Sequence, residues 1–296
     1  MIVIKKNYKY PWFKPFVDKS IKSKIGKIFD KNLNTMGLKT KELENKLKKY
    51  LNVKHVILTT SGTSALFMAS MVYDLKPGDV IITQNLTWIA TINPFLIRNC
   101  KIVLADTIHK QENVNYDSLN KLIKKHKPKI VILVHMNGQA IYNKNFNKLR
   151  AKMNFKVIED AAQSFGTKGG KKNFAGTNYD IGCFSFSISK LINMVYGGFC
   201  VTNNNKLARK LIAIRNNGVN SNPENALLEL PTEKGLNLKP SDLHSCFGIE
   251  NLKNKNKIFN NAKKIYKKYE QKLKNPKLEL VKINLKNSIP VYVQVL

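Results

Sequence analysis

Two residues with side chains that could do chemistry stand at the ends of two apolar runs. Asp160 ends FKVIED (155–160), and Lys190 ends GCFSFSISK (182–190). A polar, glycine-rich loop separates the runs. An amine and a carboxylate facing one another are what a pyridoxal 5'-phosphate (PLP) site needs. The lysine forms a Schiff base with the cofactor aldehyde, and the acid keeps the pyridine nitrogen protonated.

A candidate phosphate-binding turn lies earlier in the chain. The segment 56–59 reads as a buried strand, Ser61-Gly62-Thr63 as a turn, and 65–73 as a helix. Free backbone N–H groups and the helix dipole meet at such a turn, which favours a phosphate. An ordinary capped helix is the alternative. The segment TKGGKK (167–172) lacks the spacing of a nucleotide phosphate loop.

The elements that must position these residues alternate along the chain. We expect strands at 79–83, 101–106, 129–135, 155–160 and 196–203, and helices at 89–98, 116–126, 143–153 and 206–218. Short apolar runs separated by helices predict a mostly parallel sheet covered on both faces. Ligands of such sheets bind at the carboxyl ends of the strands, where Trp88, His135, Asp160 and Lys190 are expected.

The two ends of the chain have weaker patterns. Helical periods run through 22–33 and 40–52, and Thr40 is a candidate N-cap. Beyond an irregular segment at 220–240, the pattern predicts a long helix over 241–273 that bends near Gly248, then strand-like runs at 278–283 and 289–296. We therefore expect a large domain over 1–235 and a small one over 236–296.

The charge of the chain is high, with 51 basic residues, 19 acidic residues and a net charge of +32. Only four of the basic residues are arginine, the residue that reads guanine edges and clamps phosphate in bidentate fashion. The lysines are spread along the whole chain, and Lys, Asn and Ile share A/T-rich codons. A biased genome explains the charge at least as well as an anionic partner does, and we expect no nucleic-acid partner.

Composition also bears on the compartment. No targeting pattern and no apolar run of about 18 residues is present, so we expect a soluble, cytoplasmic protein without a membrane partner. The four cysteines (Cys100, Cys183, Cys200 and Cys246) are far apart. This spacing suggests packed thiols, with neither a metal site nor a disulfide framework.

Four segments together resemble a known family. TTSGTSAL (59–66), VIEDAAQSFG (157–166), CFSFSISK (183–190) and YGGFCVTN (196–203) are similar to motifs of the DegT/DnrJ/EryC1/StrS sugar aminotransferases. The resemblance runs from about Asn34 to Leu252. It implies a PLP-dependent enzyme of the aspartate aminotransferase fold, with a three-layer α/β/α large domain and a small C-terminal α+β domain.

The resemblance also implies roles for individual residues. Lys190 would form the Schiff base and carry the proton, Asp160 would pair with the pyridinium nitrogen, and Gln163 would contact the 3-oxygen of the ring. Ser185, Gly62 and Thr63 would bind the cofactor phosphate, and Trp88 would stack on the ring. Asn237 would reach the phosphate of the other subunit, which implies a homodimer with shared sites.

Each of these residues also has a plain structural interpretation. Lys190 could lie on the surface, and Asp160 could cap a helix. Gln163 could bond within its loop, Trp88 could pack in the core, and Ser185 could bond to the backbone. For His135 we favour the structural role.

The activity implied by the resemblance is transfer of an amino group from an amino acid, by family analogy glutamate, to a nucleotide-linked keto-sugar. The product would feed polysaccharide, lipopolysaccharide or amino-sugar synthesis. One alternative is a PLP-dependent sugar dehydratase, in which histidine replaces the lysine, so Lys190 argues against it. Another is a PLP-binding paralogue without activity. Family members continue past the position of Leu296, so we expect a fragment, a truncated gene product or a reduced small domain.

Overall fold

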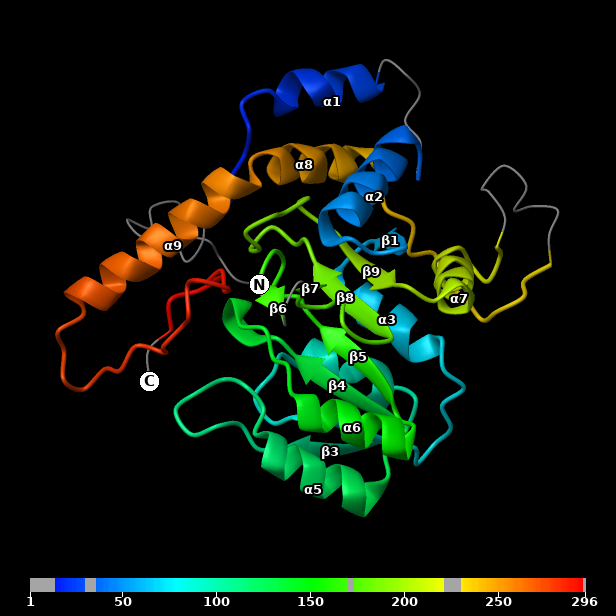
Figure 1. The fold of residues 1–296 in the computed structure, drawn as a ribbon. Helices are drawn as coiled ribbons and strands as arrows, with labels where there is room; N and C mark the ends of the chain where they lie inside the picture. The colour runs from blue at the N-terminus through cyan, green and yellow to red at the C-terminus, as the bar shows by residue number, and fades with distance from the viewer. Residues whose placement is uncertain (1–13, 30–35, 170–172, 221–229, 295–296) are drawn as a thin grey trace, which may run out of the picture.

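The computed structural model describes residues 14–29, 36–169, 173–220 and 230–294 (Figure 1). In these ranges the α-helices are α1 (Ile21–Phe29), α2 (Leu38–Leu51), α3 (Gly62–Met71), α4 (Asn93–Leu96), α5 (Tyr116–His126), α6 (Lys144–Met153), α7 (Asn205–Arg215), α8 (Asp242–Lys253) and α9 (Lys255–Lys272). The strands are β1 (His55–Thr59), β2 (Val80–Gln84), β3 (Lys101–Ala105), β4 (Ile130–Val134), β5 (Lys156–Asp160), β6 (Lys168–Gly169), β7 (Asn173–Phe174), β8 (Ile181–Ser185) and β9 (Gly198–Thr202). Two short 3-10 turns are η1 (Ile89–Thr91) and η2 (Met136–Gly138).

The central sheet has seven strands in the order β1-β9-β8-β5-β4-β2-β3. Strand β9 runs antiparallel to both of its neighbours, and the other pairs are parallel. The sheet is therefore mostly parallel, as the alternating pattern predicts. Strands β5 and β8 are parallel neighbours with Asp160 opposite Cys183, so their carboxyl ends meet at one edge of the sheet.

Helices cover both faces of this sheet because side chains alternate along each strand. Ile130, Ile132 and Val134 of β4 pack with α3, α4 and α7 on one face. Val131 and Leu133 pack with α5 and α6 on the other face. At the β1 end, α2, α8 and the start of α9 cover that second face, and Figure 1 shows α1, α2 and α8 together above the sheet. The result is a three-layer α/β/α arrangement.

Local caps set where two of the helices begin. Asn115 caps α5 by accepting hydrogen bonds from the amides of Asp117 (2.9 Å) and Ser118 (3.2 Å), and Lys127 ends the helix in the left-handed region. The predicted range 116–126 is therefore confirmed. Ser61 caps α3 in the same way by accepting from the Ser64 amide at 3.0 Å.

Two predictions about helices are wrong. Thr40 does not cap α2, which begins at Leu38 after Gly37. Thr40 is buried inside the helix, where its hydroxyl donates to Asp242 Oδ1 at 2.7 Å. The long C-terminal helix divides at Asn254, between α8 and α9, and Gly248 lies within α8. An added Cβ at Gly248 would come within 2.6 Å of Leu43 Cδ2, so this glycine serves close packing of α8 on α2.

The two predicted C-terminal strands are also wrong for the described residues. Neither 278–283 nor 289–294 forms a strand there, although Leu280 makes an isolated bridge and the Val281 amide donates to Gln294 O at 3.0 Å. The second run instead lies against the loops that follow β4 and β5, where the Ile289 amide donates to Thr167 Oγ1 at 3.2 Å. Residues 295–296 lie outside the described residues. The division into domains at 235/236 stays a prediction.

Candidate cofactor site

Asp160, the last residue of β5, is 5% exposed, and both oxygens of its carboxylate are hydrogen-bonded. Thr91 Oγ1 donates to Oδ2 at 2.7 Å, and the Ala162 amide donates to Oδ1 at 3.1 Å. Burial raises the pKa of this carboxyl above its ordinary value, while Thr91, Ala162 and the nearby charge of Lys190 offset part of that rise. A buried acid of this kind suits a partner that brings a positive charge.

Lys190 lies just past the carboxyl end of β8, in a turn where its amide donates to Ser187 O at 2.9 Å. Its side chain is half-buried. Since β8 lies beside β5 in the sheet, the turn brings the amine to the same edge as Asp160. Both residues therefore lie at one edge of the sheet, as expected, while their catalytic roles stay predictions.

The predicted phosphate-binding residues also come together. Gly62 is the first residue of α3, and an added Cβ there would lie 2.7 Å from the Cβ of Ser185. Ser185 is the last residue of β8. The first amides of a helix have no acceptor within the helix, and Ser61 accepts only from Ser64 and Ala65. Within the described residues, the amides of Gly62 and Thr63 therefore donate no hydrogen bond. These two amides and the Ser185 hydroxyl form a cradle suited to a phosphate.

Gln163 follows β5 in the loop after Asp160. Its Oε1 accepts a hydrogen bond from the backbone amide of Asn137 at 3.0 Å, so the Nε2 group is the one left to donate. Asn137 is fully buried and holds a positive φ of 46°. A fixed amide donor at Gln163 is compatible with the predicted contact to an oxygen of the cofactor ring.

Two of the predicted residues are exposed. The side chain of Trp88 is 72% exposed, at the start of η1 between Thr87 and Thr91. It is not a core aromatic. Asn237 is exposed and pairs with Asn216 in an isolated bridge at the end of α7. Ring stacking by Trp88 and a reach by Asn237 into a second subunit stay predictions.

A buried hydrogen bond joins His135 to Glu159, the residue next to Asp160. His135 Nε2 and Glu159 Oε1 are 3.0 Å apart, and both side chains are 0% exposed. His135 Nδ1 accepts from the Ile141 amide at 3.1 Å, so Nε2 carries the hydrogen that Glu159 accepts. Glu159 also accepts from the amides of Gly176, Asn178 and Tyr179. The structural role favoured for His135 agrees with these contacts.

These observations together fit PLP. The cradle of free amides can take a phosphate, the buried carboxylate can pair with a ring nitrogen that carries a proton, and the lysine supplies an amine at the same edge of the sheet. Within the described residues, no group of three or more His, Cys, Asp or Glu side chains is arranged to hold a metal ion. The four cysteines are free and buried, as packed thiols should be.

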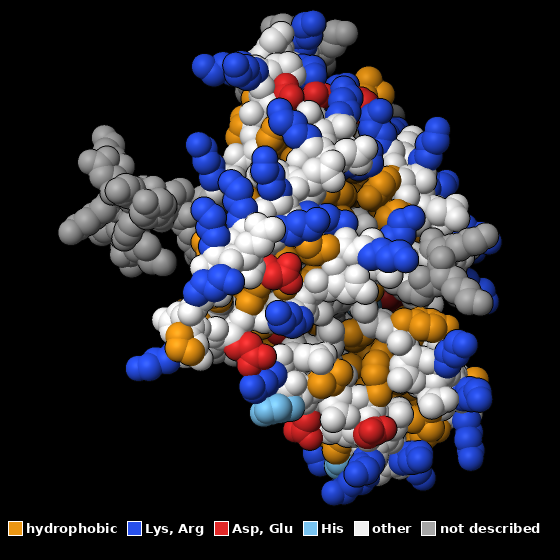
Figure 2. All heavy atoms as spheres, turned by 60° about the vertical axis from the view of Figure 1, so that its left-hand side comes forward, with side chains coloured by type: hydrophobic (Ala, Val, Ile, Leu, Met, Phe, Trp, Pro, Cys, Tyr) orange, Lys and Arg blue, Asp and Glu red, His pale blue; other side chains and the backbone are white. Residues whose placement is uncertain are grey.

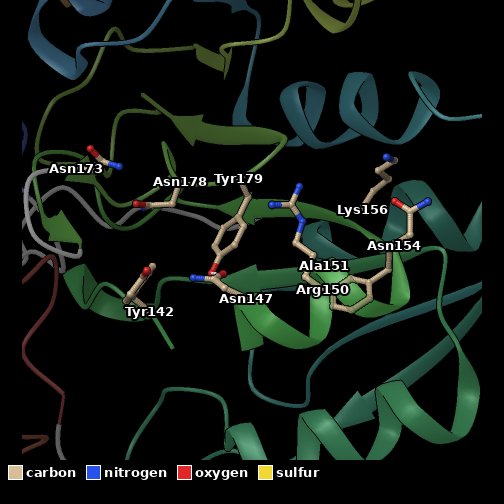
Figure 3. Close-up of a pocket in the computed structure, with 10 residues that line it drawn as sticks. Tyr142, Asn147, Arg150, Ala151, Asn154, Lys156, Asn173, Asn178 and Tyr179 are labelled. Atoms are coloured by element: carbon tan, nitrogen blue, oxygen red, sulfur yellow. Dashed lines mark hydrogen bonds between the residues drawn. The ribbon is translucent and has the colours of Figure 1, made fainter. Parts of the chain in front are cut away.

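A separate cavity of about 430 Å³ lies between α6, the start of β5 and residues 173–179 (Figure 3). None of the predicted cofactor residues lines it. Its wall is held by structural contacts, because Tyr179 donates to Asn147 at 2.8 Å and Arg150 pairs with Asp180 at 2.8 Å.

Figure 2 shows Lys and Arg side chains scattered over the visible face, in line with the even spread along the sequence.

The comparisons with known proteins identify the family. A profile of the DegT/DnrJ/EryC1/StrS aminotransferase family matches residues 15–295. The chain belongs to this family. It is 30% identical to the GDP-perosamine synthase of Caulobacter vibrioides over 242 residues, which cover 81% of this chain and 63% of that protein. It is also 30% identical to the UDP-4-amino-4,6-dideoxy-N-acetyl-beta-L-altrosamine transaminase of Campylobacter jejuni, covering 80% of this chain and 62% of that protein.

The solved structures that match confirm the fold class. The aminotransferase PseC of Helicobacter pylori, involved in pseudoaminic acid biosynthesis, matches with a TM-score of 0.87 at 23% identity, covering 98% of this chain and 78% of that one. A dehydratase relative is present as well. The GDP-4-keto-6-deoxy-D-mannose 3-dehydratase of Yersinia pseudotuberculosis is 27% identical and covers 77% of this chain and 63% of that protein. The chain thus spans less than two thirds of the length of these curated relatives.

Three residues that the sequence analysis did not single out contact the predicted site residues. Thr91 bonds to Asp160, Asn137 bonds to Gln163, and Tyr292 lies at Lys190. The spacing of Thr87 and Thr91, whose hydroxyls are 2.7 Å apart, is the one local signal that could have drawn attention to them. No helix in the described ranges is long and apolar enough to cross a membrane.

Proposed function

We propose that the chain binds PLP covalently at Lys190 and transfers an amino group from an amino acid, by family analogy glutamate, to a nucleotide-linked keto-sugar. The observation that carries this proposal is the buried carboxylate of Asp160, which shares the carboxyl edge of neighbouring strands with Lys190. The nearby cradle of Gly62, Thr63 and Ser185 supports it.

Lys190 and Asp160 would have different chemical roles in this reaction. The Lys190 amine would attach to the cofactor aldehyde and later move a proton between the substrate carbon and the cofactor. Asp160 would hold the ring nitrogen in its protonated form, with Thr91 and the Ala162 amide fixing the direction of its oxygens. When bound, PLP supplies the electron sink that makes the substrate carbon acidic.

Binding and orientation come from the surrounding residues. The free amides at the start of α3 and the Ser185 hydroxyl would hold the phosphate, and Gln163 would donate to the 3-oxygen of the ring. Trp88 would cover one face of the ring. Asn237, which is exposed, would contribute to the site of a second copy in a homodimer.

The substrate class is proposed by analogy with the relatives, whose names include a GDP-perosamine synthase and a UDP-amino-sugar transaminase. Lys190 favours amino transfer over the dehydration performed by the relative from Yersinia pseudotuberculosis. In family members that dehydrate sugars, histidine takes the place of the lysine. A PLP-binding protein without activity is the remaining alternative.

The proposal is tested by titrating the purified chain with PLP and recording its absorbance. Wild type should give a saturable band at visible wavelengths that changes on addition of glutamate, with release of 2-oxoglutarate. Lys190→Ala should give neither. A band that persists in Lys190→Ala would refute covalent binding at Lys190.

Further measurements separate the alternatives. Loaded protein mixed with glutamate and a panel of nucleotide-linked keto-sugars should form an aminated sugar without releasing ammonia. Ammonia release would instead indicate dehydration, and a band that never responds to glutamate would indicate a binding protein.

A further inference from the structure

The segment 287–294 is anchored over the loops that follow β4 and β5. The Lys168 amide donates to Asn287 O at 2.8 Å, and the Ile289 amide donates to Thr167 Oγ1 at 3.2 Å. An added Cβ at Gly138, which has a φ of +75°, would come within 1.8 Å of Ile289 O. The backbones of the two segments are therefore in direct contact.

Asn137 is the centre of this anchor. Its Oδ1 accepts from the amides of Val291 (3.1 Å) and Tyr292 (2.9 Å), and its Nδ2 donates to Gln294 Oε1 at 2.7 Å. The same residue donates its backbone amide to Gln163 Oε1. Three side-chain hydrogen bonds from one fully buried asparagine fix residues 291–294 relative to the loop that carries Gln163.

The anchored segment brings Tyr292 to Lys190. Lys190 Nζ donates to the Tyr292 hydroxyl at 3.5 Å, and it lies 5.8 Å from the centroid of the tyrosine ring. The ring attracts the lysine in its ammonium form, and the hydroxyl accepts a hydrogen bond from it in either the charged or the neutral form. A long, flexible lysine held at two points loses fewer conformations when it reacts.

We propose that Tyr292, held in place by Asn137, is a positioning residue that orients the Lys190 amine for attachment to an aldehyde. A neutral amine that donates one N–H to Tyr292 keeps its lone pair available. The condensation joins the amine nitrogen to the aldehyde carbon and releases one water molecule, so it needs no oxidant or reductant. This inference rests on the proposed function, because it assumes that Lys190 is the attachment point.

The test separates the rate of attachment from the affinity of the site. The full chain is mixed with PLP and cyanoborohydride, and the rate at which Lys190 is modified is followed by peptide mass. Affinity is measured separately with pyridoxine 5'-phosphate, which has the ring and the phosphate but no aldehyde. The variants are Tyr292→Phe, Tyr292→Leu and Asn137→Gly, the last because glycine tolerates the positive φ. Tyr269→Phe, at an exposed site on α9, is the matched control.

Tyr292→Phe should modify Lys190 about threefold more slowly, in keeping with the loss of one long, neutral hydrogen bond. Tyr292→Leu and Asn137→Gly should be about tenfold slower, and Tyr269→Phe should match wild type. Affinity for pyridoxine 5'-phosphate should change less than twofold in Tyr292→Phe.

Three outcomes overturn the inference. Equal rates in wild type and Tyr292→Phe would show that the hydroxyl does not position the amine. A parallel loss of rate and affinity would show that Tyr292 only supports the fold of the site. A Tyr292→Leu variant that is no slower than Tyr292→Phe would remove the part assigned to the ring. Failure of wild type to be modified at Lys190 would instead refute the proposed function.

Discussion

The hydroxyl of Thr91 donates a 2.7 Å hydrogen bond to Oδ2 of Asp160, and both side chains are buried. Thr91 in turn lies 2.7 Å from the hydroxyl of Thr87. A short turn after β2 thus fixes the carboxylate at the end of β5. The direction in which Asp160 presents its charge depends on this contact between residues far apart in the chain.

Thr91→Val should weaken PLP binding about fivefold to tenfold, because it removes a hydrogen bond to a charged group, worth about 1.5–3 kcal/mol, part of which a shifted neighbour restores. Fluorescence or absorbance titration measures the affinity. Thr87→Val is the matched control, because it leaves the bond between Thr91 and Asp160 in place. Equal effects of the two substitutions would argue that Thr91 has no special part in holding Asp160.

Asp160→Asn should abolish tight PLP binding and yet stabilise the chain without cofactor. The pKa of Asp160 is raised by burial, so its contribution to stability is fully present below its ordinary value of 3.8 and is lost as the pH rises through the raised value. Asparagine does not ionise and escapes this loss.

The measurement for Asp160→Asn is the Tm of wild type and variant without cofactor at several values of pH. The difference in favour of the variant should grow as the pH rises and then level off. Asp74→Asn, on the surface, should show little difference throughout. A variant less stable than wild type at neutral pH would contradict the account of Asp160 as a costly buried charge.

Gly62→Ala should lower both stability and PLP affinity. The new Cβ would lie 2.7 Å from Ser185 Cβ and 3.2 Å from its Cα, so strand β8 or helix α3 must shift. Overpacking of this kind costs about 1–3 kcal/mol. Urea unfolding and PLP titration measure the two effects.

Gly26→Ala is the control for this substitution. Gly26 lies within α1, and an added Cβ there meets nothing within 4 Å. Alanine should stabilise that exposed helix by about 0.5–1 kcal/mol. If Gly62→Ala kept wild-type affinity, the predicted phosphate cradle at Gly62 and Ser185 would be wrong.

Glu159→Gln should destabilise the fold by about 3 kcal/mol. The buried carboxylate accepts hydrogen bonds from His135 and from three backbone amides. In glutamine one of the two oxygens becomes an NH2 group, which would face these N–H donors and could accept no hydrogen bond from them. Thermal unfolding measures this effect. Glu279→Gln, which affects an exposed pair with Lys110, should change the Tm little. A small effect at Glu159 would mean that the loop 173–179 is held by other contacts.

Much of the fold can be predicted from the sequence, because local signals such as helix caps and apolar periods indicate the same elements. Helix α5 begins and ends as predicted because Asn115 caps it and its apolar period is clear. Asp160 and Lys190 could be placed at one edge of the sheet because the lengths of the apolar runs indicate parallel strands. The family motifs then connected these residues to a cofactor.

The remaining features depend on contacts between distant residues, which periodicity does not record. Thr40 resembles a cap in sequence but pairs with Asp242, which comes from α8. The runs at 278–283 and 289–294 have the composition of strands, yet the second is held by Asn137 and Thr167. Tyr292 meets Lys190 only through that tertiary arrangement.

The most direct test of the account is to find where PLP attaches. Wild type is loaded with a slight molar excess of PLP, reduced with borohydride, digested and examined by mass spectrometry, with and without excess inorganic phosphate as competitor. We expect one modified site per chain, at Lys190, which phosphate suppresses and which Asp160→Asn greatly reduces. Modification spread over many lysines, unaffected by phosphate or by Asp160→Asn, would contradict the claim that Lys190 and Asp160 form a PLP site.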